Sequence, residues 1–273
     1  TFTNGTLSGG TGRQSIGNIA AGATAATFDV VVGNASVTWA SGDGGNWYNG
    51  QATGWTGTGV TDFVNGDTVT FGSNTTTATL TSDVTVASLT MNTADHTLDG
   101  SNTLTNNGAL SISGAFVQTL NVAGEHGAIS VGVGSTLALN NTNALGSGTG
   151  TISMLGSASL LRFDFDANNL STARPISITA AGAVTARLTT NNPNTFVTLS
   201  GAITGGSSTG ALTKSGSGTV ELTGTAGWSS FTRIGDSSVA ELPGENVLRV
   251  SALPNTNLRL NQGGILEWNG STF

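Results

Sequence analysis

The chain contains 273 residues with a formal net charge of −7, and only 8% of its residues are charged, against about 25% in an average soluble domain. Its 8 Lys and Arg residues are scattered, which excludes the basic surface of a nucleic-acid-binding protein. The lack of cysteine excludes disulfides, thiolate metal ligands and cysteine nucleophiles. The sequence contains no run of about 18 apolar residues, so it does not predict a membrane-spanning helix.

Because charges are scarce, the polar surface must come from Thr, Ser and Asn. These short neutral side chains can hydrogen-bond along stacked strands, and such a surface is typical of secreted structural proteins more than of cytosolic enzymes. The many β-branched residues argue against disorder. The first residues, TFTNGTLSGG, read as strand and turn and not as a signal peptide, so we expect a mature or excised piece of a longer protein.

Short strands are predicted along the whole chain, since apolar and polar residues alternate with period two between turns of Gly, Asn, Asp and Ser. In chain order, the clearest lie at 26–33, 35–40, 67–72, 77–91, 109–113, 150–155, 159–165, 175–179, 183–190, 196–201, 218–224, 257–262 and 265–268. No window shows the apolar stripe and caps of an amphipathic helix. The predicted fold class is therefore all-β.

Turn phrases recur loosely at intervals on the order of 20–25 residues. Examples are NGALSISG (107–114), VGSTLALNN (133–141) and NTNLRLNQGGILEW (255–268). A degenerate repeat of this length favours a parallel β-helix, since each coil need offer only an apolar inward row and a turn. About a dozen coils of roughly 22 residues, stacked about 4.8 Å apart, would form a rod about 60 Å long.

Residues 38–72 interrupt this pattern, because Trp39, Trp47, Tyr48 and Trp55 stand there among many glycines with little alternation. This composition predicts a loop or cap folded over the rod, whose end must be hidden from edge pairing. We therefore expect residues 1–37 to form N-terminal coils or a linking segment, residues 38–72 the Trp-rich cap, and residues 73–273 the solenoid repeats.

Several stretches carry a family resemblance: TWASGDGGNWYNG (38–50), GDTVTFG (66–72), ATLTSDVTVASLTM (78–91) and GALTKSGSGTVELTGT (210–225). The chain resembles bacterial proteins with autotransporter-associated β-strand repeats, whose signature has the form G-L-x-K-x-G-x-G-T-L-x-L-x-G. Val220 stands where that signature has Leu. The resemblance implies a right-handed parallel β-helix in a large bacterial protein that is secreted or displayed at the cell surface.

One candidate site lies in RFDFD (162–166), where Asp164 and Asp166 are two residues apart and face the same side of a strand. Polysaccharide lyases and hydrolases use carboxylates across a cleft, so we favour an outward polar row with Phe163 and Phe165 inward. Asp164, Asp166 and Asn168 could also supply oxygens to Ca²⁺, although the Gly and distal Glu of an EF-hand loop are missing. We expect no other cofactor.

The two histidines, His96 and His126, offer no catalytic triad, because no G-x-S-x-G motif accompanies them. We expect both to be exposed turn residues and the protein not to be an enzyme. The candidate ligand site is formed by Trp47, Trp55 and Tyr48, whose aromatic faces could stack on sugar rings. The alternative is that these residues plug the cap.

These observations predict an extracellular structural β-solenoid at a bacterial cell surface, serving as a stalk, an adhesin segment or a fibre subunit. Copies of the chain could join end to end into a filament through unpaired strand edges. The alternative is a carbohydrate-binding adhesin module with glycans as partners. A further alternative is a polysaccharide-degrading enzyme, against which the scarcity of Lys, Arg and His argues.

Overall fold

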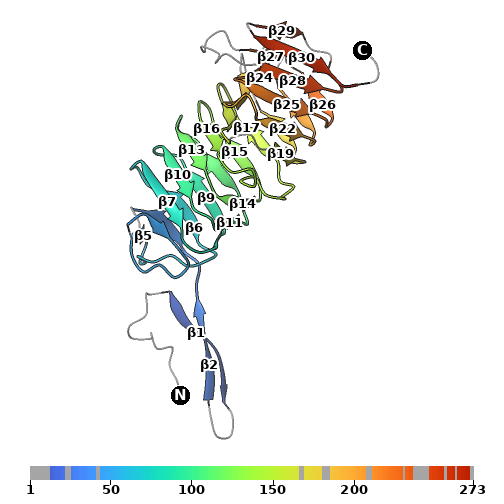
Figure 1. Ribbon diagram of the computed structural model, residues 1–273. Coiled ribbons are helices and arrows are strands. Elements are labelled where there is room, and N and C mark those ends of the chain that lie inside the picture. Colours follow the sequence, from blue (N-terminus) through green and yellow to red (C-terminus); the bar gives the residue numbers. More distant parts are fainter. Residues whose placement is uncertain are drawn as a thin grey trace.

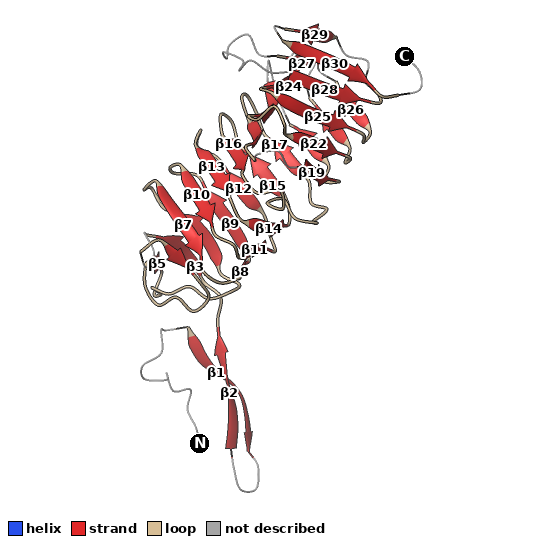
Figure 2. Cartoon of the chain, viewed as in Figure 1, coloured by secondary structure: helices blue, strands red, loops and turns tan. Residues whose placement is uncertain are grey.

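The computed structural model describes residues 13–21, 26–40, 44–165, 169–179, 185–206, 211–229, 231–235, 246–254, 257–261 and 263–270. These residues form strands and turns, and no helix that could cross a membrane occurs among them. The strands wind into a β-solenoid of stacked parallel sheets (Figures 1 and 2). The prediction of an all-β parallel β-helix with a Trp-rich cap is confirmed.

Three faces run along the stack, and we name them the first, second and third face. In spatial order, the first face consists of β5 (Trp55–Gly57), β3 (Ser36–Trp39), β6 (Thr68–Phe71), β9 (Ser88–Met91), β12 (Leu110–Ile112), β15 (Ile129–Val131), β17 (Ile152–Met154), β20 (Ile176–Ile178), β23 (Ile203–Gly205) and β26 (Ala226–Trp228). The second face consists of β4 (Asn46–Trp47), β7 (Thr76–Leu80), β10 (His96–Asp99), β13 (Val117–Leu120), β16 (Thr136–Leu139), β18 (Leu160–Phe163), β21 (Thr185–Thr190), β24 (Ala211–Ser215), β27 (Phe231–Ile234) and β29 (Leu258–Leu260).

The third face is divided into two separate sheets, unlike the other two. The first of them contains β8 (Val84–Val86), β11 (Thr103–Asn106) and β14 (Ala123–His126). The second contains β19 (Asn169–Thr172), β22 (Phe196–Leu199), β25 (Gly218–Leu222), β28 (Asn246–Val250) and β30 (Gly264–Trp268). The coil between them, at residues 140–151, contributes no strand to this face.

Successive coils pair in parallel, and the length of the coil varies along the stack. Register partners on the first face are 19 residues apart between Leu110 and Ile129 and 27 residues apart between Ile176 and Ile203, so the coils extend slightly to either side of the predicted interval. Ten strands spaced about 4.8 Å apart give a stack about 45 Å long. It is shorter than the rod of a dozen coils that we expected, because part of the N-terminal region forms a hairpin and the cap.

The core consists of inward side chains that lie above one another from coil to coil. Leu89, Leu110, Ile129 and Ile152 are consecutive register partners, and each is fully buried. Fully burying a side chain of this size stabilises the fold by about 1.5–3 kcal/mol. On the first face the alternating outward positions are nearly all Ser or Thr. Short strands suffice because each supplies a short apolar row to a narrow core.

The cap closes the N-terminal end of the stack. Strand β5 pairs antiparallel with the outer edge of β3, so this edge of the first face is covered. Beneath it, Trp39, Trp47, Trp55, Phe63 and Phe71 are at most 2% exposed, and their ring centroids are 4.9–6.1 Å apart. This aromatic cluster fills the end of the core.

An antiparallel hairpin, β1 (Gln14–Ala21) with β2 (Ala26–Val32), projects from the capped end of the stack (Figure 1). Arg13 at its base is buried, and its guanidinium donates to Asp62 at 2.8 Å and to both carboxylate oxygens of Asp67 at 2.6 and 2.7 Å. Asp67 also accepts the backbone N–H groups of Ala35 and Val64. This network connects the hairpin base to the cap.

The segment that carries the repeat signature forms β24, a tight corner and β25. Lys214 lies in an inward column between Leu188 and Ile234 and is 1% exposed. Its ammonium donates to the backbone oxygens of Ser215 and Gly216 at 2.9 and 2.8 Å. Gly216 has a φ of 73°, a left-handed conformation that favours glycine. The Lys and Gly of the signature thus build the turn from the second to the third face.

Candidate functional site

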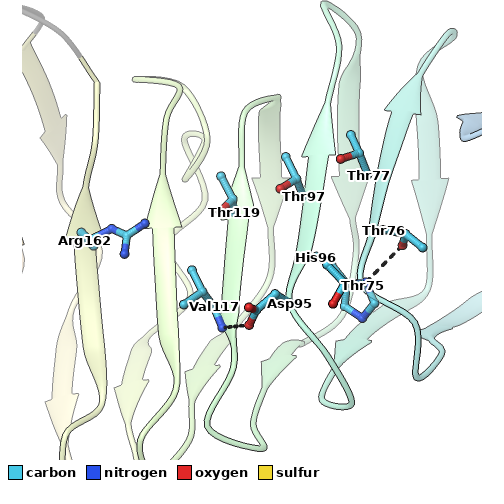
Figure 3. Close-up of a pocket in the computed structure, with 9 residues that line it drawn as sticks. All are labelled: Thr75, Thr76, Thr77, Asp95, His96, Thr97, Val117, Thr119 and Arg162. Atoms are coloured by element: carbon cyan, nitrogen blue, oxygen red, sulfur yellow. Dashed lines mark hydrogen bonds between the residues drawn. The ribbon is translucent and has the colours of Figure 1, made fainter.

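An open groove of about 430 Å³ lies on the outer surface of the second face (Figure 3). Strands β7, β10, β13 and β18 and the turns that precede them supply its lining. The residues are Thr75, Thr76, Thr77, Asp95, His96, Thr97, Val117, Thr119 and Arg162. The groove is therefore mainly a surface of threonine hydroxyls.

The floor of this groove follows the register of the sheet. Thr77, Thr97 and Thr119 are consecutive partners on β7, β10 and β13, and Figure 3 shows them in a row. The same column continues through Ala138 to Arg162. Because parallel strands repeat about every 4.8 Å, the groove offers evenly spaced hydroxyls with one guanidinium at its end.

The charged groups of the groove are held by the protein itself. Asp95 accepts the backbone N–H of Val117 at 2.7 Å, and Arg162 donates through Nε to Asp164 at 2.7 Å. The second oxygen of Asp164 accepts the side-chain N–H of Asn191 at 2.6 Å. These contacts suit hydrogen bonding to a neutral polar ligand more than acid–base chemistry.

His96 lies at the inner side of the groove and is 2% exposed. Its Nδ1 is 3.2 Å from the hydroxyl of Thr76, and its ring packs on Phe71 with centroids 5.0 Å apart. Burial lowers the pKa of His96, with the backbone of Gly72 and the charge of Asp95 acting in the opposite direction. The imidazole is therefore neutral at pH 7 and serves as part of the core.

A second groove, of about 350 Å³, opens where the third face lacks a strand. Glu125 on β14 is its only charged lining residue among those described, and both of its oxygens lie 3.0 Å from the backbone nitrogen of Ser147. The Ser147 hydroxyl donates to the same carboxylate at 3.2 Å. The carboxylate thus fastens the strandless segment 140–151 to the preceding coil.

Arg174 crosses the same gap beneath the surface and is 1% exposed. Its guanidinium donates to the backbone oxygens of His126, Gly127, Leu145 and Gly150, at 2.8–3.0 Å for the last three. A missing strand leaves carbonyl groups without ladder partners, and buried unpaired carbonyls are costly. Arg174 supplies donors to oxygens of the preceding coil and of the strandless segment itself, and so joins the two.

His126 is buried beside this guanidinium. Its Nε2–H donates to the Ala144 oxygen at 3.0 Å, and its Nδ1 has no hydrogen-bond partner. Burial, followed by the positive charge of Arg174, lowers the pKa of His126 to about 4. This imidazole is also neutral at pH 7.

The residues predicted to bind sugars lie in the cap. Trp47 and Trp55 are 0% and 2% exposed, so neither indole has a face open to a sugar ring, and Tyr48 is only partly exposed. This is the arrangement expected of a plug, because the rings stack on one another. The two indole rings are therefore covered by the protein and cannot serve as a sugar platform.

The proposed calcium ligands are only partly within the described residues. Asp164 uses both carboxylate oxygens within the protein, as given above, whereas Asp166 and Asn168 lie outside the described residues. Phe163 and Phe165 are 0% and 4% exposed, which matches the expected inward orientation. Among the described residues no cluster of three metal-ligating side chains occurs.

The expectation that both histidines are exposed turn residues is wrong, because His96 and His126 lie on β10 and β14 with their rings buried. Sequence reasoning also missed three buried cations, Arg13, Arg174 and Lys214. The sequence has only 8 basic residues, and this scarcity was the one indication that an individual Arg or Lys could have a structural role. Of the three residues, only Lys214 stands in a recognisable motif.

Comparison of the chain with protein-family models, with curated proteins and with solved structures found no match.

Proposed function

We propose that this chain is a structural segment, a rigid β-solenoid spacer in a secreted or surface-displayed bacterial protein. The observation that carries the proposal is the continuous stack: two ten-stranded faces share one apolar core among the described residues. A backbone ladder along the whole axis gives length and stiffness with few residues per rung.

The surface chemistry supports the same role. Outward positions on the first face are nearly all Ser or Thr. The carboxylates of both grooves are hydrogen-bonded within the protein, and the two histidines are buried and neutral. The resemblance to autotransporter-associated repeats supports a bacterial, extracellular setting. We propose both the family relationship and this setting.

Small-angle scattering and negative-stain images of the purified chain test this role. We expect an elongated particle whose stack is about 45 Å long, with no release of reducing sugar from a panel of acidic and neutral polysaccharides. A compact particle, or turnover of a polysaccharide, would contradict the proposal.

The threonine groove on the second face supports a second candidate, a carbohydrate-binding module. Evenly spaced hydroxyls beside a carboxylate and a guanidinium can hydrogen-bond a polyhydroxylated chain. Glycan-array binding that is lost in Thr97→Val and kept in Thr70→Val, on the first face, would support this function. Equal binding by both variants, or no binding by the native chain, would remove it.

A further inference from the structure

Three arginines that are far apart in the sequence lie in one outward column of the second face. Arg187, Thr213, Arg233 and Arg259 are consecutive register partners on β21, β24, β27 and β29. Each coil returns the chain to the same face, so these residues follow one another along the axis at about 4.8 Å per coil. We name the three arginines the arginine row. It places positive charge on one side of a chain whose formal net charge is −7.

An aromatic ring orients two members of the arginine row. The guanidinium carbons of Arg233 and Arg259 lie 5.4 and 4.4 Å from the ring centroid of Phe231, which is a half-buried outward residue of β27. A contact of this kind is worth about 0.5–1 kcal/mol at an exposed site. Stacking uses the face of the guanidinium plane and leaves the N–H donors at its edge available to a ligand.

A third stacked arginine, on the third face, shows what is different about these two. The guanidinium of Arg249 lies 5.3 Å from the ring centroid of Phe196. It also bonds to Glu267 at 2.7 Å and lies 3.8 Å from Glu221, so its charge is balanced within the protein. Within the described ranges, the two arginines stacked on β27 form no ion pair with a carboxylate.

We propose that the arginine row binds a linear acidic polysaccharide, with carboxylate or sulfate groups of the sugar chain on Arg233 and Arg259. A guanidinium donates two parallel hydrogen bonds to such an oxyanion. Binding of the ligand breaks no ion pair with a described carboxylate, and it balances a charge that these residues leave unbalanced.

The shape of the row indicates a chain more than a small anion. The positive charges follow one another along the axis of the sheet and do not surround one point, and Arg187 continues the line two coils before Arg233. A polymer that carries anionic groups at intervals can contact several of these charges at once, and such contacts add up.

The inference goes beyond the spacer role and concerns a surface other than the threonine groove. The groove is lined from β7 to β18, whereas the arginine row begins at β21. A solenoid with this row would lie side-on against an acidic glycan layer through its second face. Because the charges are on the surface, added salt should screen the attraction.

Isothermal titration calorimetry of the full chain at low ionic strength tests the proposal, with dextran sulfate, polygalacturonate and neutral dextran as probes. We expect the native chain to bind a polyanion and not neutral dextran, and added salt to weaken the binding. Arg233→Gln and Arg259→Gln should each lower the affinity on the order of tenfold. Arg249→Gln changes the net charge by the same amount and removes a stacked arginine that is already paired, so it should lower the affinity less than about twofold.

Other outcomes would overturn the assignment. An equal loss of affinity in Arg249→Gln and Arg233→Gln would show that binding follows net charge alone. The absence of binding to both polyanions, or equal binding to neutral dextran, would remove the site. Preferential binding to phosphatidylserine vesicles or to a single-stranded oligonucleotide would refute a glycan as the partner. Unfolding curves of each variant verify that the fold is intact, and none of these outcomes bears on the elongated shape that tests the spacer role.

Discussion

The ammonium of Lys214 donates to the side-chain oxygen of Asn246 at 2.8 Å, and both residues are 1% exposed although 32 positions separate them. The contact joins the second face to the third face at the next coil. The Asn246 oxygen and the backbone oxygens of Ser215 and Gly216 together accept from the ammonium. A charged side chain can therefore occupy an inward column whose neighbouring positions are apolar.

Replacing Lys214 by Met keeps the length of the side chain and removes the donor. The oxygens of Ser215, Gly216 and Asn246 then lose a buried partner, so we expect the free energy of unfolding to fall by about 2–3 kcal/mol. Urea denaturation measures this change. Arg162→Met, which breaks a partly exposed ion pair, serves as the control and should cost less than about 1 kcal/mol. Equal losses in the two variants would contradict the role of Lys214.

Replacing Arg174 by Lys should loosen the coil that lacks a third-face strand. A lysine keeps the positive charge but cannot reproduce the planar array of donors, and backbone oxygens around the gap lose their partners. We expect faster hydrogen exchange at residues 140–151 and unchanged exchange on β9 and β12. Arg249→Lys, on the outer surface, should leave residues 140–151 protected. If both variants exchange alike, Arg174 does not support this segment.

The stability of the fold should decrease as the pH falls below neutrality. His126 is neutral in the folded chain, where burial and Arg174 lower its pKa to about 4, whereas in the unfolded chain its pKa is about 6.5. Below about pH 6.5 the unfolded state binds the extra proton, so the loss grows as the pH falls and reaches about 3 kcal/mol below pH 4. His96 acts in the same direction.

Comparison of the native chain with His126→Gln isolates this contribution. Denaturation midpoints at pH 7, 5 and 4 should fall less steeply in the variant than in the native chain. Parallel pH profiles of the two proteins would mean that His126 does not titrate in this range.

Replacing Trp47 by Ala should open the capped end. The indole contacts Trp39, Trp55, Phe63 and Phe71, and removing a buried Trp costs about 3–5 kcal/mol. We also expect association through the uncovered edge of β3, seen as concentration-dependent scattering. Trp268→Ala, at the other end, should cost less, since that side chain is only partly buried. A monodisperse Trp47→Ala variant of native stability would contradict the cap.

The sequence predicted the architecture because its periodicity is local. Alternation of apolar and hydroxyl residues identifies strands, and a repeat near the length of one coil identifies stacking, so the parallel solenoid and the Trp-rich cap could be foreseen. The antiparallel pairing of β5 with β3 could not, because the three residues of β5 carry no alternation.

The candidate grooves were less predictable for a physical reason. The threonine row depends on register between strands about 20 residues apart, and a shift of one residue would turn each Thr inward. The buried cations depend on carbonyl groups left unpaired by corners and by the missing strand. A residue type alone does not reveal those carbonyls, which is why the buried positions of Arg174 and His126 were not predicted.

The division of the third face has a mechanical consequence. Two sides of the rod carry uninterrupted hydrogen-bond ladders, while the third is held at residues 140–151 by a carboxylate and a guanidinium. The resistance of the solenoid to bending must therefore differ with direction. Under a sideways force we expect the solenoid to bend at residues 140–151, with the third face opening.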